Sequence, residues 1–441
     1  MSRSSAETDL RERTGSIRHL DAARARDLVC EFTKPVPVDD DGSRFDDSDP
    51  IATTSWGRLT LANHPAEPCQ PDRLGHYQTH LHLHGLERLP LSVARELARH
   101  RGHLYLDGLR SITAGVAAEL ADHLACGLSL NGLAALAGPA AAALGRHVGE
   151  LSLNGLRRLG PGAAIGLARH AHELYLGGVE RLTPLAAAAL SRHRGDLFLD
   201  GLARLPSRVA AHLARHPGKL HLHGLHILSD AAAEALGSRV GFLCLKRVER
   251  LSAVQARLLA GHTGPLHLYA VDVDDIVAEQ LGRHSGALMI RVPEDLPLGR
   301  LEALVQHRGQ LALNGLRHLD ERRARVLAAQ PAAGGFAGLT GLFVDAVEQI
   351  TPAVAAILAT HRAGELSLNG LTTLSEDVAR ELVRHPLLSL GGVTSVTDRV
   401  AVMLAGHAGG SLVLRRLRHA SAAALARLRA NPGIELPEDG R

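Results

Sequence analysis

The hydrophobic positions of this chain recur with a period of 22 to 24 residues. The segments LSLNGLAAL, LSLNGLRRL, LALNGLRHL and LSLNGLTTL, which start at Leu128, Leu151, Leu311 and Leu366, are almost identical. Self-similarity at a fixed period predicts a repeat protein in which each unit packs only against its neighbours. One interval is longer, at 31 residues. The first leucines of the successive Leu-x-Leu segments are Leu59, Leu81, Leu104, Leu128, Leu151, Leu174, Leu197, Leu220, Leu243, Leu266, Leu288, Leu311, Leu342, Leu366, Leu388 and Leu412.

Each repeat contains a strand pattern followed by a helix pattern. Leu-x-Leu has the alternation of a short strand with one buried side, and the Asn-Gly or Asp-Gly that often follows predicts a turn. A helix start is expected nine residues after the first leucine, and proline follows this position at Thr183 and Thr351. The predicted N-caps are Thr113, Thr183, Ser229, Ser252, Thr351, Ser375 and Thr397. The predicted buried helix pairs are Ala94 and Leu97, Ala187 and Leu190, Ala256 and Leu259, and Ala379 and Leu382.

These units resemble leucine-rich repeats, in particular the short Leu-x-Leu-x-Gly-Leu units of bacterial, planctomycete-type proteins. The resemblance covers residues 56–436, about sixteen repeats. It implies an α/β fold: a curved solenoid with short parallel strands on the concave face and helices on the convex face, used mainly to bind macromolecules. The chain has a second Leu or Val after the Gly where the common family pattern has Asn or Cys. We therefore expect no buried ladder of asparagine side chains.

The ends of the repeat array differ from its middle. Residues 17–29 match 316–328, so we interpret residues 1–33 as a degenerate capping repeat that keeps its helix and lacks its strand. Residues 34–55 are rich in Pro and Asp and predict a solvated loop. Residues 331–341 form an irregular insertion, Ile434 and Leu436 predict a last strand, and residues 437–441 are a tail.

The cysteine content indicates a reducing compartment, and the charge content indicates no strong electrostatic field. The 49 Lys and Arg nearly balance the 46 Asp and Glu, so the net charge of +3 supplies no strong field for nucleic acid or an anionic membrane. Cys30, Cys69, Cys126 and Cys244 are far apart and form no Cys-x-x-Cys pair. The N-terminus has no apolar signal segment, and no run approaches the roughly 18 apolar residues of a membrane span. The prediction is a cytoplasmic protein.

The residue between the two leucines of each strand is expected on the concave face. Phe, Trp and Tyr number only eleven, yet six of them, including Phe242 and Phe343, fall on predicted concave positions. Exposed aromatic residues beside charged ones are typical of interface hot spots; the alternative is that cross-strand ring contacts only stabilise the sheet. The predicted contacts with a macromolecular partner, which we expect to be a protein, are Tyr105, Tyr175, Phe198, His221, His223, Lys246, His267 and Tyr269.

Histidine occurs in two kinds of place. Twelve of the 27 recur at the end of the repeat helix, where they are expected to be structural, bonding the last helix carbonyls at the negative end of the helix dipole. Four others, His80, His82, His84 and His103, lie on two adjacent predicted strands and are candidates for a metal site, with Asp107 beside them. His221 and His223 with His267 form a weaker candidate. The helix-end residues are His100, His123, His147, His170, His193, His216, His262, His284, His307, His361, His385 and His407.

The sequence contains no complete motif for calcium binding, phosphate binding or nucleophilic catalysis. The acidic segment around Gly42 has Pro37 at the first ligand position of a calcium loop and Ser48 at the closing one. No phosphate-binding glycine motif and no Gly-x-Ser-x-Gly appear, and the acidic neighbours of Cys30 disfavour a reactive thiolate. We predict a recognition scaffold that is not an enzyme and needs no cofactor. The alternatives are a metal-binding enzyme or sensor that uses the His-rich strand, and a nucleic-acid-binding protein.

Overall fold

The chain folds as two compact units built from the same repeat. A computed structural model describes residues 14–15, 17–32, 80–123, 127–269, 272–331 and 340–437. Within these residues the first unit ends at Leu245 and the second begins at Lys246. The predicted first strand at Leu59, the loop at 34–55, most of the insertion at 331–341 and residues 438–441 lie outside the described part.

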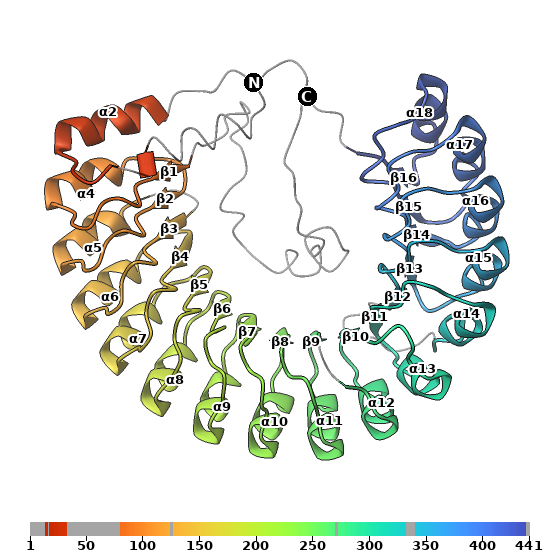
Figure 1. Ribbon diagram of the computed structural model, residues 1–441, viewed down its shortest axis with the longest axis horizontal. Coiled ribbons are helices and arrows are strands. Elements are labelled where there is room, and N and C mark those ends of the chain that lie inside the picture. The colour runs from red at the N-terminus through yellow and green to blue at the C-terminus, as the bar shows by residue number, and fades with distance from the viewer. Residues whose placement is uncertain are drawn as a thin grey trace. The chain divides into compact units, whose positions relative to one another are not determined.

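The first unit alternates eight short strands with helices, with the strands on the inner side and the helices on the outer side of the layer (Figure 1). Neighbouring strands pair in parallel and in chain order, with their first leucines in register, as Leu174 is with Leu197. The strands are β1 (Leu81–His82), β2 (Leu104–Tyr105), β3 (Gly127–Ser129), β4 (Glu150–Ser152), β5 (Leu174–Tyr175), β6 (Leu197–Phe198), β7 (Leu220–His221) and β8 (Leu243–Leu245). The helices are α2 (Ala22–Phe32), α4 (Leu91–Leu97), α5 (Ala114–Ala121), α6 (Gly138–Leu144), α7 (Pro161–Leu167), α8 (Pro184–Leu190), α9 (Ser207–Leu213) and α10 (Asp230–Gly237).

The second unit has the same arrangement, and its paired strands are also parallel and in chain order. Its strands are β9 (Leu266–Leu268), β10 (Leu288–Arg291), β11 (Gln310–Asn314), β12 (Gly341–Phe343), β13 (Glu365–Ser367), β14 (Leu387–Ser389), β15 (Ser411–Val413) and β16 (Ile434–Glu435). Its helices are α11 (Ala253–Ala260), α12 (Asp275–Gly282), α13 (Leu298–Val305), α14 (Glu321–Ala328), α15 (Pro352–Leu358), α16 (Glu376–Leu382), α17 (Asp398–Ala405) and α18 (Ala422–Arg429). The predicted α/β fold of parallel strands alternating with helices is confirmed.

The helices begin where the sequence predicts. All seven predicted Ser or Thr caps accept a hydrogen bond from the backbone N–H three residues later, as Thr183 Oγ1 does from Ala186 at 3.2 Å. Pro184 occupies the first turn after Thr183, where its missing N–H costs nothing. Asp274 and Ser421 cap further helices in the same way.

The core of each unit consists of the strand leucines and the predicted helix pairs. Ala187 and Leu190 of α8, like the other predicted pairs, have no exposed surface. The small Ala lets the helix approach the strand layer, and the Leu fills the remaining space. The recurring turn glycines have a related cause, because a Cβ added at Gly155 would collide with the carbonyl oxygen of Asn131 in the preceding repeat. Gly155 thus permits close stacking of the backbones, whereas Gly315 also has a positive φ of 120°.

The helix-end histidines form a buried ladder in each unit, which confirms that they are structural. Successive rings stack with centroids 5.6 to 6.2 Å apart, and His193 and His216 lie within 2° of parallel. Burial lowers the pKa of His170 to about 3 and of His307 to about 4. His170 and His307 are therefore neutral at pH 7, so for these rings the expected charge interaction with the helix dipole does not operate.

In three repeats a residue other than histidine occupies the ladder position and donates hydrogen bonds to the preceding repeat. Arg239 donates to the carbonyls of His216 and Gly218 in the preceding repeat. Gln330 Nε2 donates to the carbonyl of Gly309 at 2.9 Å, and Asn431 Nδ2 to that of Ala405 at 2.9 Å. In these three repeats the ladder side chain donates to buried carbonyls of the preceding repeat, which satisfies them.

The predicted helix of the N-terminal segment is present as α2. Asp21 Oδ1 accepts a hydrogen bond from the backbone N–H of Arg24 at 2.8 Å, as Asp320 does from Arg323 at 2.7 Å in the matching repeat. Ala25 is fully buried, and Arg26 binds Glu96 of α4 at 3.2 Å. Its role as a cap stays a prediction. None of the described helices has the length and apolar character needed to cross a bilayer.

Candidate functional site

The strand face of the first unit, meaning the side of its strands turned away from the helices, presents one residue from each strand. In β5, β6 and β7 the leucines are buried, and the next residue is half-buried: Tyr175, Phe198 and His221. The parallel register places these three side by side, because Tyr175 pairs with Phe198 and Phe198 with His221. Four of the predicted contact residues, these three and His223, are thus brought together.

Tyr175, Phe198 and His221 form a continuous aromatic stack. The ring centroids of Tyr175 and Phe198 are 4.1 Å apart with planes 10° from parallel, and those of Phe198 and His221 are 4.0 Å apart at 13°. Phe242 adds a tilted ring 5.0 Å from His221. The rings therefore stabilise one another across strands, as the alternative interpretation holds, while part of each ring remains exposed for contact with a partner.

Carboxylates border the aromatic stack. Burial, with the negative charge of Glu173, raises the pKa of Glu150. Burial also raises the pKa of Tyr175, and the neighbouring carboxylates add to this shift, so the phenol stays protonated. Asp196 is bound by Lys219 at 2.9 Å, which neutralises that one pair. The strand face around Tyr175 is therefore acidic as well as aromatic.

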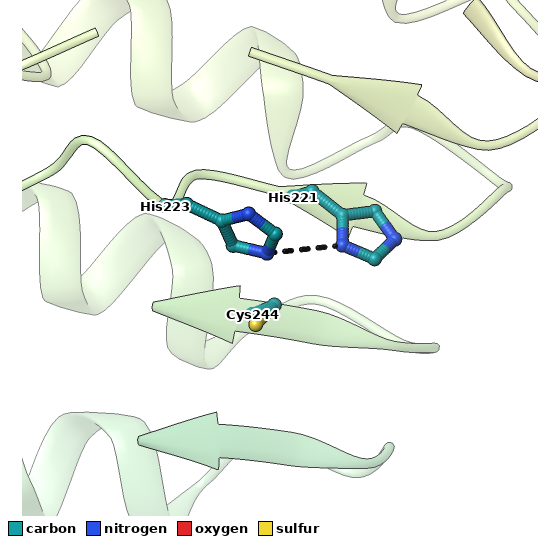
Figure 2. A group of neighbouring side chains, drawn as sticks. All are labelled: His221, His223 and Cys244. Carbon is teal, nitrogen blue, oxygen red and sulfur yellow. Dashed lines mark hydrogen bonds between the residues drawn. The ribbon is translucent and has the colours of Figure 1, made fainter. Parts of the chain in front are cut away.

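His221 and His223 meet a cysteine of the next strand (Figure 2). His221 Nδ1 and His223 Nε2 are 3.3 Å apart, and the other nitrogen of His223, Nδ1, lies 3.2 Å from Asp200 Oδ1. Cys244 is in register with His221 and is buried. One ligand atom from each of His221, His223 and Cys244 lies within 4.8 Å of the others, the only such group of His, Cys, Asp or Glu among the described residues.

His267 was the third member predicted for this cluster, whereas the group that the first unit brings together contains Cys244. His267 belongs to the second unit and is only 6% exposed. Cys244, which lies between Leu243 and Leu245, is predicted on the concave face but not as a ligand. The signal that identifies it was present in the repeat: Leu243 and Leu220 are equivalent, so Cys244 has to lie beside His221.

The four histidines of the first predicted metal site make contacts of a different kind. His82 Nδ1 lies 3.2 Å from His84 Nε2, and the rings of His80 and His103 are 5.0 Å apart. Burial, with a smaller effect of His80, lowers the pKa of His103 to about 4. Tyr105 stacks on His82 at 4.3 Å. No three ligand nitrogens of this set approach one another as closely as the His221 group, although all four residues are described.

Aromatic residues on the strand face of the second unit are more deeply buried than predicted. Phe343 is 1% exposed and packs with Ala287, Met289 and Ala312. Tyr269 covers this cluster, with its hydroxyl 3.3 Å from Met289 Sδ. The expectation that concave-face aromatics are exposed is therefore wrong for Phe343, because side chains from adjacent strands close over it.

Lys246 and Tyr269 keep partly exposed surface in the second unit. The Lys246 ammonium lies 5.2 Å from the centroid of the Tyr269 ring, a cation–π geometry. The pair is held by its own contact and leaves the outer faces of both side chains accessible.

The recurring Asn of the strand face has a structural cause. Asp107 Oδ1 accepts a hydrogen bond from the backbone N–H of Asn131 at 2.8 Å. Asn131 Oδ1 accepts from that of Asn154, and Asn154 Oδ1 from that of Gly177, both at 2.7 Å. A ladder of the same kind begins at Asp345. Asn131 is half-buried and Asn154 is exposed, so the asparagine ladder of these repeats is not buried, as expected. It lies at the edge of the strand layer instead.

Comparison with known proteins adds fold likenesses. No protein-family model matches the sequence, and no curated protein matches it. The chain is similar to a leucine-rich-repeat protein of Leptospira interrogans, at 17% identity over 80% of this chain and 93% of that one, with a TM-score of 0.36. It is also similar to an internalin of Listeria monocytogenes, at 14% identity over 78% and 88% of the two chains and a TM-score of 0.31. A third likeness is to a chain of the yeast Rad7–Elc1 complex, at 18% identity over 62% and 81%, with a TM-score of 0.36. The assignment of the fold rests on the chain's own strands and helices.

Proposed function

We propose that this chain is a non-enzymatic recognition scaffold that binds a protein partner through the strand face of its first unit. The observation that carries the proposal is the aromatic stack of Tyr175, Phe198 and His221, which is half-buried in a protein whose other described aromatics are few. Aromatic side chains provide large, rigid contact area at small entropic cost and dominate many interfaces. A stack open on one side is suited to such contact.

The charge around the stack indicates the chemistry of the partner. The positions that flank β4 to β7 on the strand face carry the carboxylates of Glu150, Glu173, Asp196 and Asp200 against one ammonium, that of Lys219. A partner segment that combines Lys or Arg with apolar side chains satisfies both the carboxylates and the rings, through charge-assisted hydrogen bonds and cation–π contacts. The same carboxylates repel phosphate groups, which disfavours nucleic acid.

The remaining predicted contact residues differ in how much of their surface is exposed to a partner. Tyr105, Lys246 and Tyr269 are half-buried and remain proposed contacts. His267, at 6% exposure, has little surface to offer and serves packing within the second unit.

The proposal is tested by capturing partners from the cell of origin with two variants. Tyr175→Ala with Phe198→Ala removes two adjacent rings of the stack, the end ring and the middle one. Leu185→Ala is the matched control, because Leu185 is an apolar residue of α8, on the helix side, and is 71% exposed. Bound proteins are quantified by mass spectrometry, and folding is followed by thermal denaturation of each variant.

We expect the double variant to lose at least about tenfold of the captured partner while its melting temperature stays near that of the parent, since hot-spot aromatics contribute about 2 kcal/mol or more each to binding. Leu185→Ala should capture as the parent does. Loss of capture in proportion to loss of folded protein would show that the stack is structural. Equal loss in Leu185→Ala would place the binding surface on the helices.

A further inference from the structure

We propose that His221, His223 and Cys244 form a binding site for a single zinc-type divalent cation, with two imidazole nitrogens and one sulfur as ligands. The site goes beyond the proposed protein-binding function and does not depend on it. Its three residues come from two adjacent strands, β7 and β8, and lie together on the strand face (Figure 2).

The separation of the two imidazoles already fits tetrahedral coordination. Two nitrogens that each bind zinc at about 2.0–2.1 Å in a tetrahedron lie about 3.3–3.4 Å apart. His221 Nδ1 and His223 Nε2 are 3.3 Å apart. In the metal-free protein one nitrogen donates its proton to the other across this distance, so the cation takes the place of that proton without moving the rings apart.

Cys244 supplies the third ligand. A nitrogen and a sulfur bound to the same zinc lie about 3.6 Å apart, given a zinc–sulfur distance of about 2.3 Å. One ligand atom of each of the three residues lies within 4.8 Å of the others, so a small movement of the side chains brings the sulfur to this distance. Cys244 forms no disulfide in the structure and is 1% exposed, which protects a thiolate bound to metal from the solvent. Mixed imidazole and thiolate ligands favour Zn²⁺ or copper over Mg²⁺ and Ca²⁺.

Asp200 orients the second imidazole for this role. Its Oδ1 lies 3.2 Å from Nδ1 of His223, which fixes the proton on Nδ1 and leaves the lone pair of Nε2 directed toward His221. A carboxylate behind a metal-binding histidine is the usual outer partner of such sites, and it strengthens the imidazole as a ligand. Phe198, stacked on His221 at 4.0 Å, holds the other ring in place.

The first strands of the unit contain a built-in control. His82 and His84 repeat the His-x-His pair with a separation of 3.2 Å, and Asp107 Oδ2 lies 3.4 Å from His84 Nδ1. The residue in register with His82 is Tyr105, which stacks on the ring instead of offering a thiol. The two pairs therefore differ chiefly in whether the next strand supplies a third ligand.

The site is tested by cobalt and zinc titration of the full chain, purified without a histidine tag and stripped with chelator. We expect one equivalent of Co²⁺ to bind with the visible bands of a tetrahedral site and a thiolate-to-cobalt charge-transfer band in the near ultraviolet, and Zn²⁺ to displace it. Cys244→Ser should abolish the charge-transfer band and weaken Zn²⁺ binding by about 100-fold or more. Asp200→Asn should weaken it by about 10- to 100-fold while keeping the band.

The control variant joins His82→Ala with His84→Ala and should bind Co²⁺ and Zn²⁺ as the parent does. Circular dichroism of each metal-free variant checks that it is folded, and addition of Zn²⁺ should raise the melting temperature of the parent and of the control but not of Cys244→Ser. A charge-transfer band that persists in Cys244→Ser would overturn the assignment, because it would arise from Cys30, Cys69 or Cys126. Absence of any band in the parent, or loss of binding in the control, would overturn it as well.

Discussion

Histidine has different roles at the two edges of each repeat in the first unit. At the helix end, rings such as His170 and His193 are buried, stack 5.9 Å apart and are neutral because burial lowers their pKa. On the strand face, His221 and His223 are half-buried, and His223 pairs with the carboxylate of Asp200. The residue type is the same, and its place in the repeat decides whether it supports the fold or is available to bind.

Recurrence along the chain separates these two roles. A side chain that returns in almost every repeat satisfies a need that every repeat has, here the filling of the buried space between successive helix ends. A side chain that appears in one or two repeats, as the His-x-His pairs do, meets no such general need. The comparison predicts that changes in the ladder alter stability, whereas changes on the strand face alter binding.

Lowering the pH should have the largest effect on the free energy of unfolding. The pKa values of nine ladder histidines are lowered by burial, several of them to about 3 or 4, against about 6.5 in an unfolded chain. Below pH 6.5 these histidines become protonated in the unfolded chain but stay neutral in the folded protein. The free energy of unfolding therefore has its full value above pH 6.5 and decreases as the pH falls toward 4. At pH 5.5 each of the seven histidines whose pKa is about 3 or 4 costs about 1.4 kcal/mol, so these seven together cost on the order of 10 kcal/mol.

Urea unfolding measured at half-unit steps from pH 7.5 to 5 checks this, in a window above the range in which most carboxylates titrate. A midpoint that stays constant across the window would show that the ladder histidines are protonated as easily in the folded protein as in the unfolded chain.

Truncation of a core leucine should have the next largest effect. Leu213 of α9 has no exposed surface, so Leu213→Ala should lower the free energy of unfolding by about 2 to 5 kcal/mol, and Leu190→Ala by a similar amount. Denaturant titration measures the change. A cost below about 1 kcal/mol would mean that these helices do not pack on the strand layer as described.

A matched pair of histidine substitutions contrasts the two edges directly. His193→Ala removes a fully buried ring that stacks between those of His170 and His216 and leaves a cavity, so we expect a loss of about 2 to 4 kcal/mol. His223→Ala removes a half-buried ring and should cost less than about 1 kcal/mol in metal-free protein. Equal losses in the free energy of unfolding for the two variants would contradict the distinction between the helix-end and strand-face histidines.

The repeat pattern predicts the fold well because each element depends on local signals. Leu-x-Leu sets the strand, Thr183 or its equivalent starts the helix, and Ala187 with Leu190 sets the buried face, all within one repeat. Contacts between repeats require the register as well. That register identifies Cys244 as the neighbour of His221, so this part of the candidate site was accessible from the sequence once the strands were aligned.

The remainder depends on side-chain packing that no repeat pattern specifies. Phe343 looks exposed by position, but Met289 and Tyr269 close over it. By position His170 and His307 are expected to be cations at helix ends, and only their burial, which lowers their pKa, makes them neutral. The division into two units at Leu245 also has no marker in the repeat pattern, which continues through this point.

The most direct test of the central claim, that the strand face of the first unit is the binding surface, is site-specific photo-crosslinking in the cell of origin. A benzophenone amino acid is placed at the position of Phe198 on the strand face or, in a second protein, at that of Leu185 on the helix side. We predict a discrete cross-linked product of higher mass from the first position and none from the second. Cross-linking from the position of Leu185 alone, or from neither position, would contradict the account.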